Sequence, residues 1–249
     1  MNALKLGAMT VAVFGAAQMA SAAPARNVVL VHGAFADETS WDKVANLLRH
    51  KGYHVTQVAS PLTSLDDDVA ATRKALAAQK GPTVLVGHSW GGVVVGEAGN
   101  APNVRSLVYI AAFAPDRGES VQDLGKGAPS TEGQQAIRPD ANGFLTLDRA
   151  AFPGVFMGDV PGAEAKRLAA RQHPINAAAF ATKAKVAAWH DKPTYYAISA
   201  ADRMLPPQAE GFFAHRMNAT TVTFQSSHAS PVSHPTEVVA LIERAARLK

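Results

Sequence analysis

Residues 83–98 read TVLVGHSWGGVVVGEA, and this stretch decides the fold. Its beginning, 83–87, is a short apolar run rich in β-branched residues, which is typical of a buried strand. Gly87-His-Ser-Trp-Gly91 then matches Gly-x-Ser-x-Gly, the pattern of a sharp strand-to-helix turn. Glycines are needed there because larger side chains flanking the serine would collide. Such a turn lifts a hydroxyl above the carboxyl edge of a sheet, so we predict that Ser89 is a nucleophile.

Strand and helix patterns alternate on both sides of this turn. Short apolar or β-branched runs predict strands, at 27–31, 54–58, 83–87, 105–113, 194–199 and 220–224. Amphipathic spacing and capping residues predict helices, at 41–51, 64–81, 93–98 and 235–248. This alternation predicts an α/β fold with a doubly wound, mostly parallel sheet covered by helices on both faces.

The alternation breaks between Pro115 and Asp191. The residues there include Gly-, Pro- and Ala-rich helical pieces but no clear buried strand. So long a connection within a compact domain is usually functional. We therefore expect a helical cap, about 116–191, inserted between two late strands of a single domain that covers 23–249.

The N-terminus has the pattern of an export signal. Lys5 precedes an apolar run, 6–19, that is too short to span a bilayer, and Ala20-Ser-Ala22 has the small-x-small form of a cleavage site. We expect residues 1–22 to be a signal peptide, cut near Ala22 or Ala23. The mature protein would then be periplasmic or secreted.

Composition excludes several classes of protein. The 249 residues are 47% hydrophobic and 18% charged, which suits a globular domain with a sizeable core. The net charge is +4, but the basic residues are scattered, so we expect no nucleic-acid partner. With 0 cysteines there is no disulfide, no thiolate chemistry and no cysteine-linked lipid, and we expect no stable membrane anchor. Homodimerisation is left open.

A run of acidic residues, Asp66 to Asp68, invites a metal-site interpretation. It begins two residues after Ser64, which can cap the predicted helix at 64–81. Negative charge in the first turn of a helix is favoured by the helix dipole. That explanation is sufficient, and we expect neither a metal nor a cofactor.

A serine needs a base to become a nucleophile, and in this kind of fold the base comes last in the chain. Three histidines lie late enough, at His215, His228 and His234. His228 follows the last predicted strand by a short loop, the usual place for the base. His234 directly precedes a proline at a helix start, and His215 lies within a predicted helix, so we choose His228 and keep His234 as the alternative.

The acid that orients this base should follow a late strand. Asp202 directly follows the predicted strand 194–199. The alternative is Asp116, which follows the predicted strand 105–113 but is also an ordinary turn residue after Pro115. Chain order favours Asp202.

Backbone N–H groups are expected to complete the site. His32-Gly-Ala-Phe35 follows the first predicted strand, where a His-Gly turn normally lends an N–H to an oxyanion hole. We expect Ala34 and Trp90 to supply the two donors, with Phe35 replacing Ala34 if the turn is shifted by one. His32 would brace this turn, and His88 would be structural because its side chain should point away from Ser89.

Five segments together resemble the α/β-hydrolase superfamily: HGAF (32–35), GHSWGG (87–92), AAFAPD (111–116), AADRMLPP (200–207) and HASPVSHP (228–235). The resemblance is strongest to the branch of plant methylesterases, hydroxynitrile lyases and bacterial esterases of the pyrethroid-hydrolase type, and it covers about 27–114 and 192–249. That branch pairs an Asp with a nearby Pro, then His-x-x-x-x-Ser-x-Pro. Asp202 and His228 fall on those positions, so the resemblance implies the same Ser-His-Asp triad.

The resemblance also narrows the chemistry. Hydroxynitrile lyases of this branch have a Lys directly after the catalytic His, where this chain has Ala229. Dehalogenases of the fold need Asp at the nucleophile position, which is Ser89 here. We therefore expect a serine carboxylesterase acting on a small to medium, fairly apolar ester. The alternatives are a lyase or other carbon–carbon bond enzyme with the same triad, and a ligand-binding protein with a residual triad.

The substrate pocket is the least legible part of the sequence. Large apolar side chains in and around the cap could line it, and the candidates are Phe35, Phe113, Phe144, Phe156 and Trp189.

Overall fold

The computed structural model describes residues 24–248, so the expected signal peptide lies outside the described residues. Six parallel strands form the main sheet, in the order β2-β1-β3-β4-β8-β9. Their bounds are Asn27–Val31 (β1), His54–Val58 (β2), Thr83–His88 (β3), Val104–Ile110 (β4), Thr194–Ser199 (β8) and Thr220–Phe224 (β9). The predicted α/β fold with a mostly parallel sheet is confirmed.

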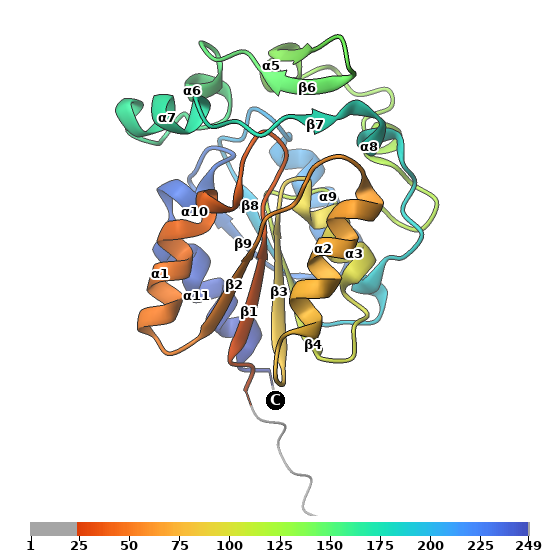
Figure 1. Cartoon of the computed structure of the whole chain (residues 1–249), viewed down its shortest axis with the longest axis vertical. Helices are drawn as coiled ribbons and strands as arrows, with labels where there is room; N and C mark the ends of the chain where they lie inside the picture. The colour runs from red at the N-terminus through yellow and green to blue at the C-terminus, as the bar shows by residue number, and fades with distance from the viewer. Residues whose placement is uncertain (1–23, 249) are drawn as a thin grey trace, which may run out of the picture.

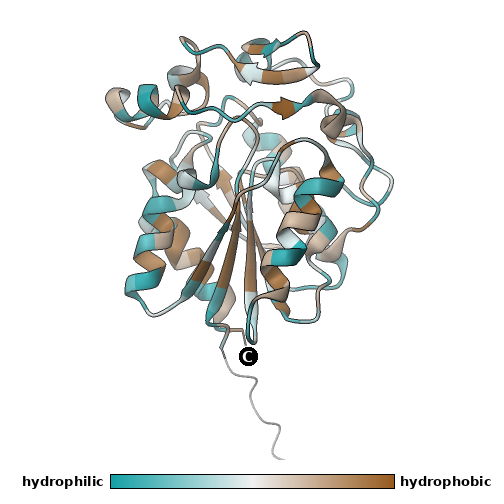
Figure 2. Ribbon diagram, viewed as in Figure 1, coloured by the Kyte–Doolittle hydropathy of each residue, from teal (hydrophilic) through white to brown (hydrophobic). Residues whose placement is uncertain are grey.

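The central strands are buried on both faces, which explains their unbroken apolar runs. Every residue of β1 and β3 is buried, as a strand covered by helices on both sides requires. The edge strand β9 instead alternates between partly and fully exposed positions until Phe224. Colouring by hydropathy shows apolar strands in the interior, flanked by helices that carry both apolar and polar residues (Figure 2).

Helices cover both faces of the sheet (Figure 1). One apolar core lies under α1 (Asp42–His50) and α11 (Pro235–Ala246). The other lies under α2 (Leu65–Ala77), α3 (Gly91–Ala98) and α9 (Pro207–Arg216). Helix α2 begins as expected, because the Ser64 side chain accepts a hydrogen bond from the Asp67 N–H at 3.1 Å.

Short helical turns complete the body of the domain. They are η1 (Glu38–Trp41), η2 (Ala188–His190) and α10 (Ser230–Ser233). Within residues 24–248, no helix is both long enough and apolar enough to cross a membrane.

The insertion between β4 and β8 contains strands as well as helices, so the expectation of a helical cap was incomplete. Its helices are α4 (Val121–Leu124), α5 (Glu132–Gln135), α6 (Phe152–Val155), α7 (Gly162–Ala169) and α8 (Ala177–Ala181). Its strands are β5 (Ile137–Pro139), β6 (Phe144–Leu147) and β7 (Ile175–Asn176), which form a small antiparallel sheet. These strands are short and largely half-exposed, so they lack the apolar run by which a buried strand is recognised.

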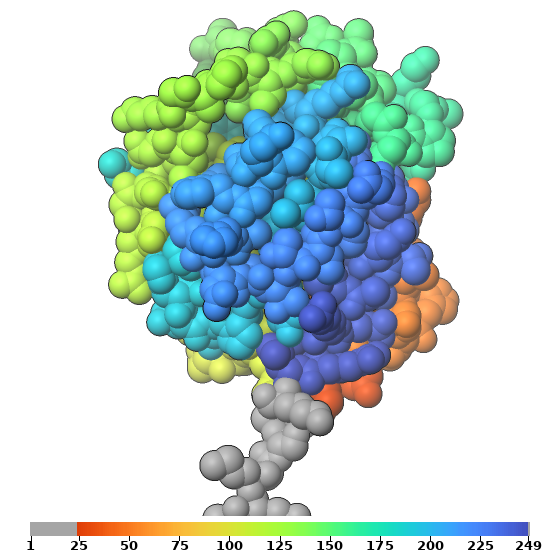
Figure 3. Space-filling model, turned by 180° about the vertical axis from the view of Figure 1, so that it is seen from behind, coloured from red at the N-terminus to blue at the C-terminus, as the bar shows by residue number. Residues whose placement is uncertain are grey.

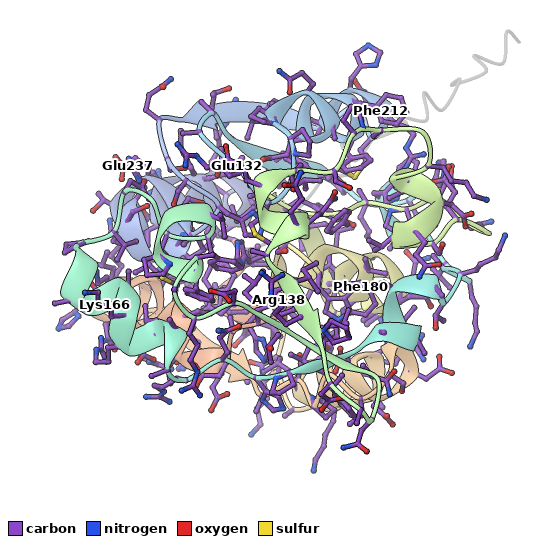
Figure 4. The ribbon with its side chains drawn as sticks, turned by 90° about the horizontal axis from the view of Figure 1, so that it is seen from above. Glu132, Arg138, Lys166, Phe180, Phe212 and Glu237 are labelled. Atoms are coloured by element: carbon purple, nitrogen blue, oxygen red, sulfur yellow. The ribbon has the colours of Figure 1, made fainter. Side chains whose placement is uncertain are left out.

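The cap lies on the carboxyl edge of the main sheet. Seen from behind, its atoms rest directly on those of the domain body (Figure 3). Seen from above, Arg138 and Phe180 lie over the inner part of the domain, whereas Phe212 of α9 lies at its rim (Figure 4). Backbone hydrogen bonds join cap and body, from Asn176 N–H to the Leu62 carbonyl at 2.9 Å and from Gly133 N–H to the Arg203 carbonyl at 3.0 Å. The cap therefore closes over the edge at which β3 ends.

Candidate active site

Ser89 occupies a strained turn between β3 and α3. Its φ is 52°, in the left-handed backbone region that residues other than glycine rarely adopt. The turn is held by a hydrogen bond from the Ser89 N–H to the Ile110 carbonyl at 3.2 Å. A Cβ on Gly87 would lie 2.5 Å from the Gly91 carbonyl oxygen, and one on Gly91 would lie 2.6 Å from that of Val31. Both glycines are therefore sterically required.

His228 and Asp202 form a buried pair. The His228 Nδ1 lies 2.5 Å from the Asp202 Oδ2, and both side chains are almost completely buried. Asp202 sits just after β8, in a loop whose backbone also serves it: Oδ1 accepts hydrogen bonds from the N–H groups of Met204 at 2.6 Å and Leu205 at 2.8 Å. These donors fix the carboxylate, so its second oxygen holds the imidazole in one orientation.

Two aromatic side chains, in addition to Asp202, hold His228 in place. The His88 Nε2 lies 2.8 Å from the His228 backbone carbonyl, and the two rings are 4.8 Å apart. Burial, followed by the neighbouring His228, lowers the pKa of His88 well below its ordinary value, so His88 is neutral and donates this hydrogen bond. Phe156 of the cap places its ring 4.8 Å from the His228 ring in an edge-to-face contact. His88 thus has a structural place, as expected.

Ser89 and His228 line the same cavity, of about 340 Å³. The described part of the chain shows no direct hydrogen bond between them. Such contacts often tighten only when substrate binds. The cavity is mostly apolar and has no Asp, Glu, Lys or Arg among its lining residues, which are Ala34, Phe35, Ser89, Trp90, Phe113, Val121, Gln122, Gly125, Gln134, Ile137, Leu145, Phe156, Ala177, Phe180, Met204, Leu205 and His228.

Ala34 and Trp90 lie beside Ser89, as expected. Within residues 24–248, neither backbone N–H donates a hydrogen bond to another protein group. The two turns approach closely, since a Cβ on Gly33 would lie 2.8 Å from the Ser89 Cβ. Phe35 adopts a positive φ of 62° at the end of the first turn. The two free N–H groups can therefore stabilise negative charge next to the Ser89 hydroxyl.

His32 braces the first of these turns. Its Nδ1 lies 2.9 Å from the Gly33 carbonyl oxygen, and its Nε2 accepts a hydrogen bond from the Ser60 N–H at 3.1 Å. Burial lowers the pKa of His32, which favours the neutral ring that this pair of contacts requires.

Asp68 supports the second turn from behind, which sequence reasoning missed. It is fully buried, and its Oδ2 accepts a hydrogen bond from the Trp90 indole at 2.8 Å. Its Oδ1 accepts another from the Leu62 N–H at 2.8 Å. The three acidic residues of the first turn therefore differ: Asp68 faces inward, whereas the neighbouring carboxylates face solvent. Within residues 24–248, no group of three or more His, Cys, Asp or Glu side chains is arranged to hold a metal ion.

The rival site residues lie elsewhere. Asp116 contacts His190 at 2.9 Å, on the surface and away from the cavity. The His234 Nδ1 lies 2.9 Å from the Ser233 hydroxyl and 3.4 Å from the Asp159 carboxylate. His215 is on α9, outside the cavity lining.

Phe35, Phe113 and Phe156 line the cavity, but Phe144 and Trp189 do not. Trp189 packs instead beside Arg216 and donates to the Pro115 carbonyl at 3.2 Å, and Phe144 pairs with Asn176 in the small sheet. Sequence reasoning missed most of the cap's contribution, which comes from Val121, Gln122, Gln134, Ile137, Leu145, Ala177 and Phe180. No spacing rule identifies these residues, because the short elements that carry them have no shared period.

The chain is similar to several known proteins. Residues 28–241 match the model of the alpha/beta hydrolase family. The chain is 26% identical to a probable hydrolase of Phoma sp. over 202 residues, which is 75% of this chain and 81% of the relative. It is 31% identical to a carbendazim hydrolyzing esterase of Nocardioides sp. over 112 residues, which is 39% of this chain and 46% of the relative.

A solved pyrethroid hydrolase of Sphingobium faniae superposes with a TM-score of 0.77 at 23% identity, covering 89% of this chain and 97% of that one. The likeness extends through the cap as well as the sheet, because the matched share exceeds the body of the domain. The family match over most of the chain agrees with the fold and with the resemblance found in the sequence. This chain belongs to the alpha/beta hydrolase family.

Proposed function

We propose that this protein is a serine carboxylesterase. The observation that carries the proposal is the buried His228–Asp202 pair facing, in one apolar cavity, a serine held on a strained turn. The similarity to proteins described as hydrolases and esterases supports the same class of reaction.

In this mechanism His228 Nε2 takes the proton of the Ser89 hydroxyl as its oxygen attacks the ester carbonyl carbon. Asp202 keeps the other proton of the ring on Nδ1 and stabilises the imidazolium that forms. The N–H groups of Ala34 and Trp90 donate to the carbonyl oxygen as it becomes negative, a contribution of about 3 kcal/mol for each donor in comparable sites. His228 then protonates the departing alcohol.

Water completes the cycle in a second, matching half. His228 removes a proton from the water molecule, which attacks the acyl-enzyme carbonyl, and then returns a proton to Ser89. The acid leaves and the free serine is restored. Each step uses only side chains and backbone groups already in place around the cavity.

The substrate we propose is an uncharged ester of small to medium size. Apart from Ser89 and His228, the polar side chains of the lining are Gln122 and Gln134, which are neutral. A carboxylate or ammonium in this cavity would lose its hydration with no opposite charge to replace it, and that is costly. No lining Lys or Arg is available to hold a leaving anion, so nothing in the cavity favours the lyase alternative.

The test is hydrolysis of a series of p-nitrophenyl esters of increasing acyl length, with one member that carries a terminal carboxylate. We expect turnover of the neutral esters and little of the charged one. Asp202→Asn should lower kcat by about 10⁴-fold, the effect of trapping the wrong tautomer in a comparable triad. Asp116→Asn is the matched control, because it alters an Asp–His pair outside the cavity. Equal activity of these two variants would contradict the proposal.

A further inference from the structure

A second buried carboxyl group lies behind the Ser-His-Asp site. Glu210 belongs to α9 and is completely buried. Its Oε2 accepts a hydrogen bond from the Ser199 N–H at 3.0 Å. Its Oε1 is also buried, and no donor in the described part of the chain faces it. An ionised carboxylate left with one donor in such a place is strongly disfavoured.

The titratable groups that face Glu210 supply no positive charge. They are Asp202, which shares Ser199 with Glu210 because the Asp202 N–H donates to the Ser199 carbonyl at 3.2 Å, and Tyr196 on β8. The Tyr196 hydroxyl already donates to the Ala112 carbonyl at 2.6 Å and accepts from the Ala112 N–H at 3.0 Å, so it has no proton to give. Two neighbouring buried carboxyl groups without a cation cannot both ionise readily.

The surrounding donors decide which of the two keeps its charge. Asp202 accepts hydrogen bonds from two backbone N–H groups and from His228, so three donors stabilise its anion. Glu210 has a single donor, from Ser199. Burial, followed by the neighbouring Asp202 charge, raises the pKa of Glu210 well above its ordinary value of 4.5. The negative charge of the pair therefore rests on Asp202 and the proton on Glu210.

We propose that Glu210 is a positioning residue for the triad, in which its neutral carboxyl donates a hydrogen bond to Asp202. This inference rests on the proposed function, because Asp202 is the acid of that triad. A neutral donor behind Asp202 holds the carboxylate against His228 without competing for the imidazole. A second negative charge at the same point would instead act on the ring and on every step in which the ring changes charge.

Two variants separate the donor from the charge. Glu210→Gln keeps the shape, keeps an oxygen for the Ser199 N–H and offers Asp202 an N–H in place of the O–H. We expect it to retain kcat within about threefold of the parent, with an unchanged acid limb of the pH–rate profile. Glu210→Leu removes the donor and should lower kcat about tenfold or more with little change in KM.

Activity measurements can overturn the proposal in three ways. A Gln variant as impaired as the Leu variant would mean that an ionised Glu210 is needed. A Leu variant with the parent's kcat would mean that Glu210 positions nothing. An acid limb that moves in the Gln variant would also show that a charge had been removed, which contradicts a neutral Glu210.

The pH dependence of the free energy of unfolding tests the protonation state of Glu210 without any turnover. This measurement is valid even if the proposed function fails or the Leu variant does not fold. Because folding raises the pKa of Glu210, the protonated carboxyl contributes stability that is fully present below pH 4.5. This stability is lost as the pH rises towards the pKa of Glu210 in the folded protein. The unfolding equilibrium constant of the parent, relative to Glu210→Gln, should rise about tenfold for each pH unit in that range. A constant ratio between pH 5 and 8, by urea titration at each pH, would overturn the proposal; a rising ratio supports it.

Discussion

Replacing Asp68 with asparagine should disturb the Ser89 turn from a position that touches no substrate. Asp68 is buried behind Trp90, and its two oxygens accept from two different donors, the Trp90 indole and the Leu62 N–H, each at 2.8 Å. An asparagine has one acceptor oxygen, so its NH₂ group must face the other donor. The Leu62 backbone has a positive φ of 57°, and this hydrogen bond helps to hold it there.

The magnitude follows from the donors that are lost. A hydrogen bond to a charged acceptor contributes about 1.5–3 kcal/mol, and a buried donor left unpaired costs a similar amount. Burial raises the pKa of Asp68, with the Trp90 and Leu62 donors opposing it, so removing the buried charge offsets part of that loss. We expect Asp68→Asn to lower the free energy of unfolding by about 1–3 kcal/mol.

The same change should also slow catalysis. The backbone N–H of Trp90 is one of the two proposed oxyanion donors. The Trp90 ring is fixed by a hydrogen bond to Asp68 on one side and by an edge-to-face contact with Phe180 at 5.4 Å on the other. A small displacement of such a donor lowers kcat, and we expect roughly a ten- to hundredfold loss with a smaller change in KM.

Urea unfolding and steady-state kinetics on a neutral p-nitrophenyl ester measure the two effects. Asp66→Asn is the matched control: it lies in the same helical turn, but its carboxylate is exposed and pairs with Lys185 on the surface. If Asp68→Asn matched Asp66→Asn in both stability and kcat, the buried hydrogen bonds of Asp68 would contribute nothing to the turn.

Two further predictions concern the contact between cap and body. Gly133→Ala would place a Cβ 2.9 Å from the Arg203 carbonyl oxygen beside the Asp202 loop, so it should lower kcat and stability. Gly154→Ala is the control, because it lies in a cap helix with open space around it and should change neither. The activity and melting temperature of the two variants check this prediction. Burial alone would raise the pKa of Asp159, but hydrogen bonds led by the Ser227 hydroxyl outweigh it and lower that pKa. Asp159 therefore stabilises the fold at pH values above 3.8, its ordinary pKa. The urea midpoint of Asp159→Asn should lie below that of the parent at neutral pH, and the difference should disappear as pH falls through the lowered pKa.

The sequence was most informative where one local pattern had one physical cause. The Gly87–Gly91 turn predicted the strand before it, the helix after it and the place of Ser89, because only a tight turn needs those glycines. Chain order and position in the loops after late strands were enough to choose His228 and Asp202, which the structure brings together.

The cap was harder to predict for a physical reason. Its strands are short, half-exposed and paired with one another, so their stability comes from tertiary contacts that leave no period in the sequence. The pocket lining was hard to predict for a similar reason, since Trp189 is a large aromatic residue like Phe156 but packs against Arg216 outside the cavity. Glu210 and Asp68 were invisible because burial of a carboxyl group depends on which face of a helix turns inward.

Labelling with a serine-reactive phosphonate tests whether Ser89 is a nucleophile activated by His228. We expect one adduct per chain, found by mass spectrometry on the peptide that contains Ser89, with labelling abolished in Ser89→Ala and slowed by orders of magnitude in His228→Ala. An adduct on another residue would contradict the claim. So would a folded protein that is never labelled, or unchanged ester hydrolysis by Ser89→Ala.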